Sequence, residues 1–395
     1  MNGPFLWSLF LCHFGGNLLC YLQLLVILVS LYPAVVLSAQ SDVADGSGSR
    51  VIPVRYSEET ELLAVVCHLA DIGGYDFSEE DGVLSDYLSD VDSCFAPFRN
   101  HKAVKFAAER LYRRGFSYDL PMALALRLTI DDGHLKYNEG LVDDFDGYYE
   151  RISRPDEKKF IALLEDFYHQ SSFREFFNSH MKVYRECEEA MREVVDKLDM
   201  GWYDSFFGPI EDVEFCVYLG LLNGPGNFAI HQKNSDGTEL VNALMGCCDR
   251  DSDGKIYYGE VYTLPVLVHE FNHSYCNPMN EEIWDSIRQK ANAIFSENAE
   301  FYSSIAYGAP EYIMNEMFVE ASMIRYLTSH PLDLSGSAFN GMDELIDRLI
   351  LVDDKKKFSL VRTMIDVLGR REAEQSTYPT MRDFLPEYVK AINAE

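Results

Sequence analysis

Positive charge is scarce in this chain. Its 395 residues include 34 lysines and arginines against 64 aspartates and glutamates, a formal net charge of −30. Binding to the phosphates of a nucleic acid needs clustered lysine and arginine side chains, so this composition argues against a nucleic-acid partner. A strongly acidic surface is instead typical of a soluble secreted protein and disfavours polyanionic substrates.

Cysteines with metal-binding spacing are also absent. None of the nine cysteines forms a Cys-x-x-Cys motif, the common spacing of zinc-binding thiolates. Seven of them follow the first forty residues at irregular spacing, and this odd number predicts no disulfide framework. We interpret the adjacent Cys247 and Cys248 as small strand residues rather than metal ligands.

The first forty residues differ from the rest. An apolar run over 18–36 is followed by small residues at 37–40, which predicts a signal peptide and an exported protein, whether periplasmic, at the cell surface or secreted. However, residues 1–17 contain no lysine or arginine, and the apolar run is long enough to cross a bilayer. An uncleaved membrane anchor over 1–40 therefore stays open as the alternative.

The sequence HEFNH at residues 269–273 points to a metal site. Two histidines four residues apart on a helix face the same side, and a glutamate after the first is the arrangement of zinc peptidases. The flanking residues predict a buried helix over 264–276. Thr263 can serve as the N-cap, Pro265 fits a first turn, and Asn277-Pro278 would follow the end. The alternative is a core helix with two hydrogen-bonded histidines, but these groups are hard to bury without a cation.

A catalytic zinc ion needs a third protein ligand and one position left for water. The best candidate is Glu316, which borders the apolar stripe of a helix expected over 311–329 and so faces inward. Glu320, one turn later, would be a second inward carboxylate, and a cation would offset the cost of burying both. The alternative is that both glutamates face solvent. The rival ligands are Glu320 itself, Glu311, Glu300 and Glu297.

Asn315-Glu316 with an acid four residues later resembles the second signature of thermolysin-like gluzincins. This resemblance implies that Glu316 binds zinc and that Glu320 supports a ligating histidine. The chain as a whole resembles an uncharacterised bacterial family that is catalogued as a domain of unknown function and presumed to contain zinc peptidases. The segments that carry this resemblance are 61–63, 69–70, FRNHK at 98–102, 117–119, HEFNHSYCNP at 269–278, 306–308, 315–316 and 378–380.

The chain departs from that family's pattern after the expected ligand. Where the pattern has an arginine, this chain has Glu320 followed by Ala321, which reverses the local charge. If the arginine normally holds a substrate carboxylate or braces the ligand, activity here is an open question. The alternative functions are a non-catalytic secreted binding protein that keeps the fold and a zinc amidase acting on cell-wall or glycan amides.

These residues predict a zinc metallopeptidase acting on a peptide or protein substrate. The three metal ligands would be His269, His273 and Glu316. Zinc would lower the pKa of a water molecule, and Glu270 would accept its proton and later return it to the leaving amine. For the donor that stabilises the oxyanion, Tyr307 is the first choice and Tyr312 the second, while His231 is left outside this prediction.

The residue pattern predicts an α+β fold, a mostly helical zincin-like metallopeptidase with a small antiparallel sheet beside the HExxH helix. A linker over 41–55 would lead to a helical region over 56–200 and a catalytic region over 201–395, with one compact unit over 56–395 as the alternative. Besides 264–276 and 311–329, the expected helices are 59–70, 86–98, 103–114, 120–128, 160–198, 341–352, 357–369 and 380–393. The expected strands are 213–222, 228–232, 240–247 and 256–262.

Zinc peptidases of this kind pair an extended substrate with an antiparallel edge strand, which we expect to be 240–247 or 256–262. The loop between these two strands matches the EF-hand calcium pattern. Its ligands would be Asp249, Asp251, Asp253, Lys255 and Glu260. A true EF-hand needs a helix directly after the loop, whereas 257–262 resembles a strand. We therefore favour a β-hairpin turn, with calcium binding as the alternative.

Overall fold

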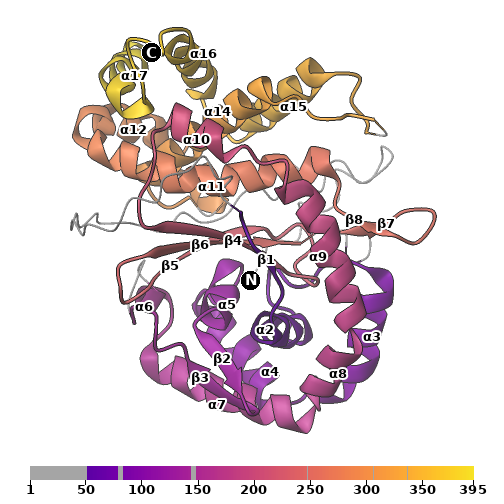
Figure 1. Ribbon diagram of the computed structural model, residues 1–395. Helices are drawn as coiled ribbons and strands as arrows, with labels where there is room; N and C mark the ends of the chain where they lie inside the picture. Colours follow the sequence, from indigo (N-terminus) through magenta and orange to yellow (C-terminus); the bar gives the residue numbers. More distant parts are fainter. Residues whose placement is uncertain (1–50, 79–82, 144–147, 247, 306, 336) are drawn as a thin grey trace.

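The computed structural model describes residues 51–395 except 79–82, 144–147, 247, 306 and 336 (Figure 1). The predicted leader, most of the predicted linker, and Cys247 lie outside the described residues. Within the described part of the chain, no helix combines the length and apolar character needed to span a membrane. The predicted α+β class is confirmed, because helices dominate and a small sheet lies among them.

The N-terminal half packs around helix α2 (Glu58–Leu69), which is buried along almost its whole length. Its N-cap is Ser57, whose side chain accepts a hydrogen bond from the backbone N–H of Thr60. The surrounding elements are α3 (Ser85–Phe95), α4 (Lys102–Phe106), α5 (Asp119–Ala125), β2 (Leu128–Asp131), β3 (His134–Tyr137), α6 (Tyr148–Arg151), α7 (Arg154–Gln170), α8 (Phe173–Ser179), α9 (Met181–Val195) and α10 (Met200–Phe206).

Two long helices expected from the sequence are broken into shorter pieces. The expected helix over 160–198 is interrupted at Ser172, whose φ of 52° is left-handed, and again at His180, so that three helices α7, α8 and α9 result. The expected helix over 103–114 begins as α4 and continues as one π-helical and one 3₁₀ turn up to Gly115, where φ is positive.

The central sheet has four strands in the order β1-β4-β6-β5. These are β1 (Val54–Arg55), β4 (Val213–Leu219), β6 (Glu239–Met245) and β5 (Phe228–Lys233). The pairs β1–β4 and β4–β6 are parallel and only β5–β6 is antiparallel, so the expectation of an antiparallel sheet is wrong. The connection over 220–227, rich in glycine, carries the chain past the position of β6, which then inserts between β4 and β5.

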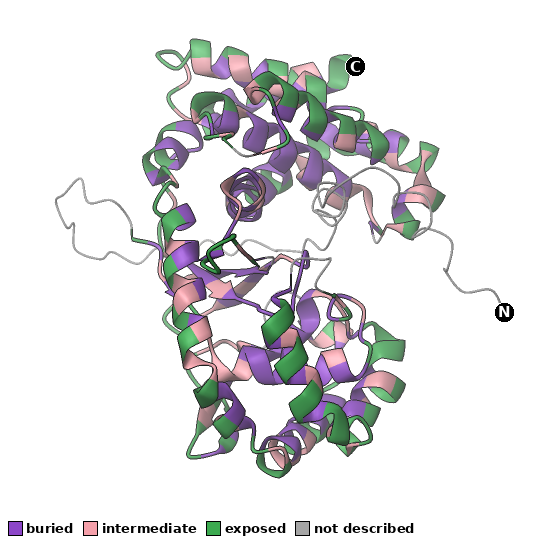
Figure 2. Cartoon of the chain, turned by 90° about the vertical axis from the view of Figure 1, so that its right-hand side faces the viewer, coloured by how far each residue is buried: buried purple, intermediate pink, exposed green. Residues whose placement is uncertain are grey.

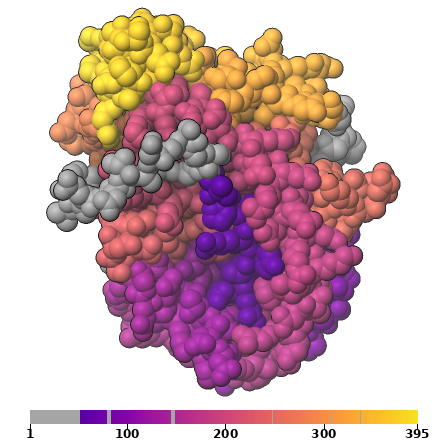
Figure 3. Space-filling view, in the orientation of Figure 1, coloured from indigo at the N-terminus to yellow at the C-terminus, as the bar shows by residue number. Residues whose placement is uncertain are grey.

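Strand β1 joins the two halves of the chain. It belongs to the segment expected to be a linker, yet it pairs with β4 of the second half. One sheet therefore contains residues from both halves, which favours the single compact unit over two separate regions. Figure 3 shows the C-terminal helices (yellow) at one end of the molecule and the N-terminal helices (purple to magenta) at the other.

Helix α11 (Glu260–Glu282) crosses one face of the sheet and contains both Pro265 and Pro278 (Figure 1). The predicted limits of 264 and 276 are therefore wrong at both ends. Each proline removes a backbone donor, but burial against the neighbouring helix α14 (Pro310–Ser329) outweighs that loss. Three hydrogen bonds join α11 to α14. Asn272 Nδ2 donates to the carbonyl of Val319 over 3.2 Å, Asn280 Nδ2 donates to Asn315 Oδ1 over 3.0 Å, and the Cys276 thiol bonds to the Ser322 hydroxyl over 3.6 Å.

The remaining C-terminal helices cover the outer side of α11 and α14. They are α12 (Trp284–Glu297), α13 (Ala299–Ser304), α15 (Met342–Lys355), α16 (Val361–Ala373) and α17 (Met381–Ala394). The predicted helices over 311–329, 341–352 and 380–393 are confirmed to within three residues, and α16 begins four residues later than predicted. Buried residues gather where the helices face one another and the sheet (Figure 2).

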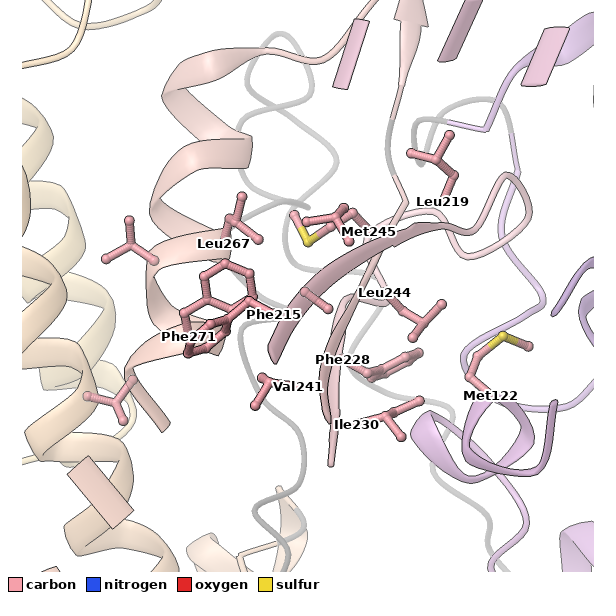
Figure 4. Packing of buried hydrophobic residues seen from close by; sticks show 14 of the residues in the cluster. Met122, Phe215, Leu219, Phe228, Ile230, Val241, Leu244, Met245, Leu267 and Phe271 are labelled. Atoms are coloured by element: carbon pink, nitrogen blue, oxygen red, sulfur yellow. The ribbon is translucent and has the colours of Figure 1, made fainter. Parts of the chain in front are cut away.

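Both faces of the sheet are buried (Figure 4). On one face Phe215 packs against Phe271 of α11, with 4.6 Å between the ring centroids. On the other face Phe228 and Ile230 point towards Met122 of α5 (Figure 4). The packed sheet therefore holds α11 in a fixed position relative to strand β5. This arrangement positions the site described next.

The outer edge of β5 is partly covered by a passing segment, residues 140–142. The N–H of Val142 donates to the carbonyl of Lys233 over 2.7 Å, and the N–H of Ser235 donates to the carbonyl of Gly140 over 2.8 Å. This covering lies at the C-terminal end of β5.

Candidate metal centre

The two histidines of the HEFNH motif lie on one face of α11, with 3.3 Å between their Nε2 atoms. Helix α14 packs alongside and brings Glu316 to both of them. One carboxylate oxygen of Glu316 is 3.6 Å from His269 Nε2, and the other is 3.6 Å from His273 Nε2. Glu316 is only 2% exposed. Three donor groups from two helices therefore converge in the protein interior.

These distances fit a tetrahedral zinc ion. Ligands about 2.0–2.1 Å from zinc at tetrahedral angles stand about 3.4 Å from one another. Within the described ranges, the group of potential ligands that contains His269 and His273 is completed by Glu316. The rival glutamates lie elsewhere: Glu297 and Glu300 are exposed and Glu311 is half-buried.

Oxygen atoms approach the second ring nitrogen of each histidine. Asn277 Oδ1 lies 3.2 Å from Nδ1 of His273, and a carboxylate oxygen of Glu320 lies 3.8 Å from Nδ1 of His269. The Asn277 hydrogen bond fixes the ring orientation of His273, whereas Glu320 attracts the ring of His269 from beyond hydrogen-bond distance. Both Nε2 atoms are left directed at a common point. Glu320 therefore sits behind His269 rather than among the three converging donors.

Burial and crowding perturb the pKa values of these groups. Burial raises the pKa of Glu270 to about 7 and raises that of Glu316. Burial acts in the same direction on Glu320, but the adjacent ammonium of Lys356 and His269 hold its pKa at about 2. Burial would lower the pKa of His269, yet Glu320 and the other carboxylates raise it to about 9. These glutamates concentrate negative charge that a divalent cation would neutralise.

Lys356 is a site residue that the sequence did not reveal. It follows the last residue of α15, it is 6% exposed, and its Nζ donates to Glu320 Oε1 over 2.9 Å. It lies 36 positions beyond Glu320, and nothing in its local pattern distinguishes it from its exposed neighbours Lys355 and Lys357. Asn277 was missed for another reason: the helical spacing from His273 pointed to it, but Pro278 suggested that the helix had already ended.

Glu270 faces the edge strand of the sheet. Its carboxylate accepts a hydrogen bond from the backbone N–H of Ala229 in β5. His231, two residues further along β5, pairs with Val241 and so lies on the sheet face that packs on α11. Burial lowers the pKa of His231 to about 4, so its ring is neutral at pH 7. The strand beside Glu270 is therefore β5, and the expectation that 240–247 or 256–262 is the edge strand is wrong.

Tyr307 lies just before α14 and is buried beside Glu316. Burial raises the pKa of its hydroxyl well above 10, and the carboxylate of Glu316 raises it further. The ring packs against Phe358 with 5.7 Å between centroids. Tyr312, the second choice, is only half-buried in the first turn of α14. Of these two tyrosines, Tyr307 is the one whose hydroxyl approaches the group formed by Glu316 and the histidines.

The EF-hand-like loop forms a β-hairpin between β7 (Asp249–Arg250) and β8 (Ile256–Tyr257). Asp251 Oδ1 accepts hydrogen bonds from the backbone N–H groups of Asp253 and Lys255, both over 2.9 Å, so this carboxylate stabilises its own turn. Glu260 begins α11 and forms an ion pair with Lys197.

The loop carboxylates are not among the groups of three metal-binding side chains found in the described residues. The residues after the loop are helical from Glu260, which corrects the predicted strand over 256–262. The loop itself pairs as the β-hairpin favoured from the sequence, although the helix that follows it removes the reason given there against an EF-hand.

Comparisons with curated proteins and with solved structures find no match. A model of the family described as "Domain of unknown function (DUF4932)" matches residues 54–391, which include every element of the site. The expected membership of a family catalogued as a domain of unknown function is thereby confirmed, whereas the likeness to thermolysin-like gluzincins and the zincin-like fold stay predictions. The chain belongs to the DUF4932 family.

Proposed function

We propose that this protein is an exported zinc-dependent metallopeptidase. The observation that carries the proposal is the convergence of His269, His273 and Glu316 at distances of 3.3, 3.6 and 3.6 Å, with the carboxylate of Glu270 next to them. Export is supported by the apolar run over 18–36. The donor set of two imidazoles and one carboxylate is that of catalytic zinc sites, in which the fourth position stays open.

Zinc bound there would act as a Lewis acid towards a peptide carbonyl and would make water more acidic. Glu270 is placed to take a proton from water and pass it to the leaving amine, because it directly follows His269 and burial raises the pKa of its carboxyl. Its hydrogen bond from Ala229 holds the carboxylate at the edge of β5.

The hydroxyl of Tyr307 would donate a hydrogen bond to the carbonyl oxygen under attack. Its high pKa keeps the proton on the oxygen at neutral pH, so it can act as a donor. The neutral ring of His231 is a second candidate donor, because it lies on the face of β5 that packs against α11.

An extended peptide would bind along β5. This strand ends the sheet on the side of the site, and an edge strand can add one more chain through main-chain hydrogen bonds. The Ala229 contact places the edge within reach of Glu270. The proposed substrate is therefore a peptide or an unfolded segment of a protein.

Two measurements test this proposal. Metal analysis of the purified protein after exhaustive dialysis should find about one tightly held zinc ion per chain, lost in His273→Ala and Glu316→Ala and kept in Glu311→Ala, the control on the same helix. Glu270→Gln should keep the metal and lose at least 100-fold in cleavage of a peptide library.

The outcomes separate the alternatives. A folded protein without tightly bound metal would overturn the zinc proposal. Tight zinc without cleavage of any peptide would favour the non-catalytic binding protein, and release of amines only from cell-wall or glycan amides would favour the amidase. Lys356 pairs with the buried Glu320 and so neutralises the negative charge that Glu320 adds. Lys356 thereby supplies the positive charge that an arginine supplies in the family's pattern.

A further inference from the structure

A second group of metal-binding side chains lies in the N-terminal half, away from α11. It consists of His134 at the start of β3, and Glu165 and His169 on α7. Each offers one ligand atom, and these atoms all lie within 4.8 Å of one another. The two α7 residues are four positions apart, so they point from the same face of the helix towards the hairpin.

The distances within this group already approach those around a metal. His134 Nδ1 is 3.2 Å from Glu165 Oε1, close to the spacing of about 3.4 Å between two ligands of one tetrahedral ion. The rings of His134 and His169 lie 6.2 Å apart at 70°. Bringing His169 into contact with the same ion needs only a side-chain movement, because it is exposed.

The surroundings hold the central carboxylate in place. The second oxygen of Glu165 accepts the backbone N–H of Leu135 over 2.9 Å, which ties α7 to the hairpin and leaves Oε1 turned towards His134. At the hairpin tip, Gly133 has a φ of +82°, and a Cβ atom built there would lie 3.0 Å from Cε1 of His169. A glycine at this position therefore lets the imidazole approach the turn.

We propose that His134, Glu165 and His169 form a second metal site, which binds a first-row divalent transition-metal ion such as Zn²⁺ and fastens the β2–β3 hairpin to α7. Two imidazole nitrogens and one carboxylate oxygen suit zinc and copper, whereas magnesium and calcium prefer oxygen ligands. The exposure of both histidines leaves a fourth position for water and gives a weaker, exchangeable site than the buried centre on α11.

The test is a zinc titration of the full protein, in which binding is measured by calorimetry. The buried centre is loaded first and weakly held metal is removed by dialysis. The wild type should then bind one further zinc ion with micromolar affinity. His134→Ala and His169→Ala should each weaken this second binding at least tenfold, whereas His330→Ala, a partly exposed histidine elsewhere, should leave it unchanged.

Two further readouts make the result specific. Zinc should slow proteolysis of the β2–β3 hairpin in the wild type and not in His134→Ala, and Mg²⁺ should have no effect at the same concentration. Gly133→Ala should weaken zinc binding, because its Cβ displaces His169. Equal binding by the wild type and both histidine variants would show adventitious binding and overturn the proposal. The second site does not depend on the peptidase proposal, since His273→Ala should still bind this ion.

Discussion

Replacing Lys356 with methionine should destabilise the metal-free protein and increase the stabilisation that zinc provides. Lys356 is 6% exposed and Glu320 is 2% exposed, with 2.9 Å between Nζ and Oε1. A methionine side chain is similar in length to that of lysine and can keep the packing of the aliphatic part of Lys356, but it removes the positive charge. Glu320 is then left as a buried carboxylate whose remaining positive neighbour is His269, 3.8 Å away.

The magnitude follows from the burial of both partners. Removing one member of a buried ion pair costs about 3–5 kcal/mol, because the other charge stays desolvated. The same change makes the site one unit more negative, so a divalent cation is attracted more strongly. At a fixed zinc concentration, the increase in unfolding free energy on adding zinc should be larger for Lys356→Met than for the wild type.

The assay is urea unfolding with and without zinc, with Lys355→Met as the control. Lys355 is the preceding residue and is exposed, so its loss should change stability by less than about 0.5 kcal/mol. The reasoning is refuted if Lys356→Met unfolds at the same urea concentration as Lys355→Met. It is also refuted if zinc stabilises the Lys356 variant less than the wild type.

Two further substitutions test the fold. Glu61 is buried, and burial raises its pKa from 4.5 to about 7. Because the folded state binds this proton more tightly than the unfolded state, the free energy of unfolding should fall by up to about 3 kcal/mol as the pH rises from 4.5 to 7. Glu61→Gln should remove this part of the pH dependence in urea unfolding at pH 5 and pH 8, and an unchanged slope would contradict the assignment. A Cβ at Gly246 would lie 2.1 Å from the carbonyl oxygen of Gly224, so Gly246→Ala should lower the free energy of unfolding by at least about 1–3 kcal/mol. A Cβ at Gly308 meets nothing within 4 Å, so Gly308→Ala should leave the melting temperature nearly unchanged. Equal melting temperatures for these two variants would refute the close approach.

The grouping of His269, His273 and Glu316 could be predicted from the sequence because its parts are local patterns. The HEFNH spacing follows from 3.6 residues per turn, and the inward direction of Glu316 followed from the apolar stripe around it. The structure brings these residues together. Lys356 could not be predicted, because its burial depends on where α15 ends relative to α14, and such packing leaves no trace in a single local pattern.

The errors in the predicted fold have physical causes. Pro278 normally ends a helix, but α11 is packed along α14 and keeps its course despite one missing donor. The parallel pairing of β4 with β6 depends on the path of the connection over 220–227, which strand patterns do not encode. The edge position of β5 follows from that path, so the sequence suggested the wrong strand for the edge of the sheet.

The covering of β5 by residues 140–142 bears on the length of any bound peptide. A peptide that extends the sheet beside Glu270 can pair with β5 only before Lys233, because the carbonyl of Lys233 already accepts the N–H of Val142. In that direction the bound chain must stop or turn away after a few residues. A peptidase built this way would favour shortening peptides near one end over cutting in the middle of long extended segments.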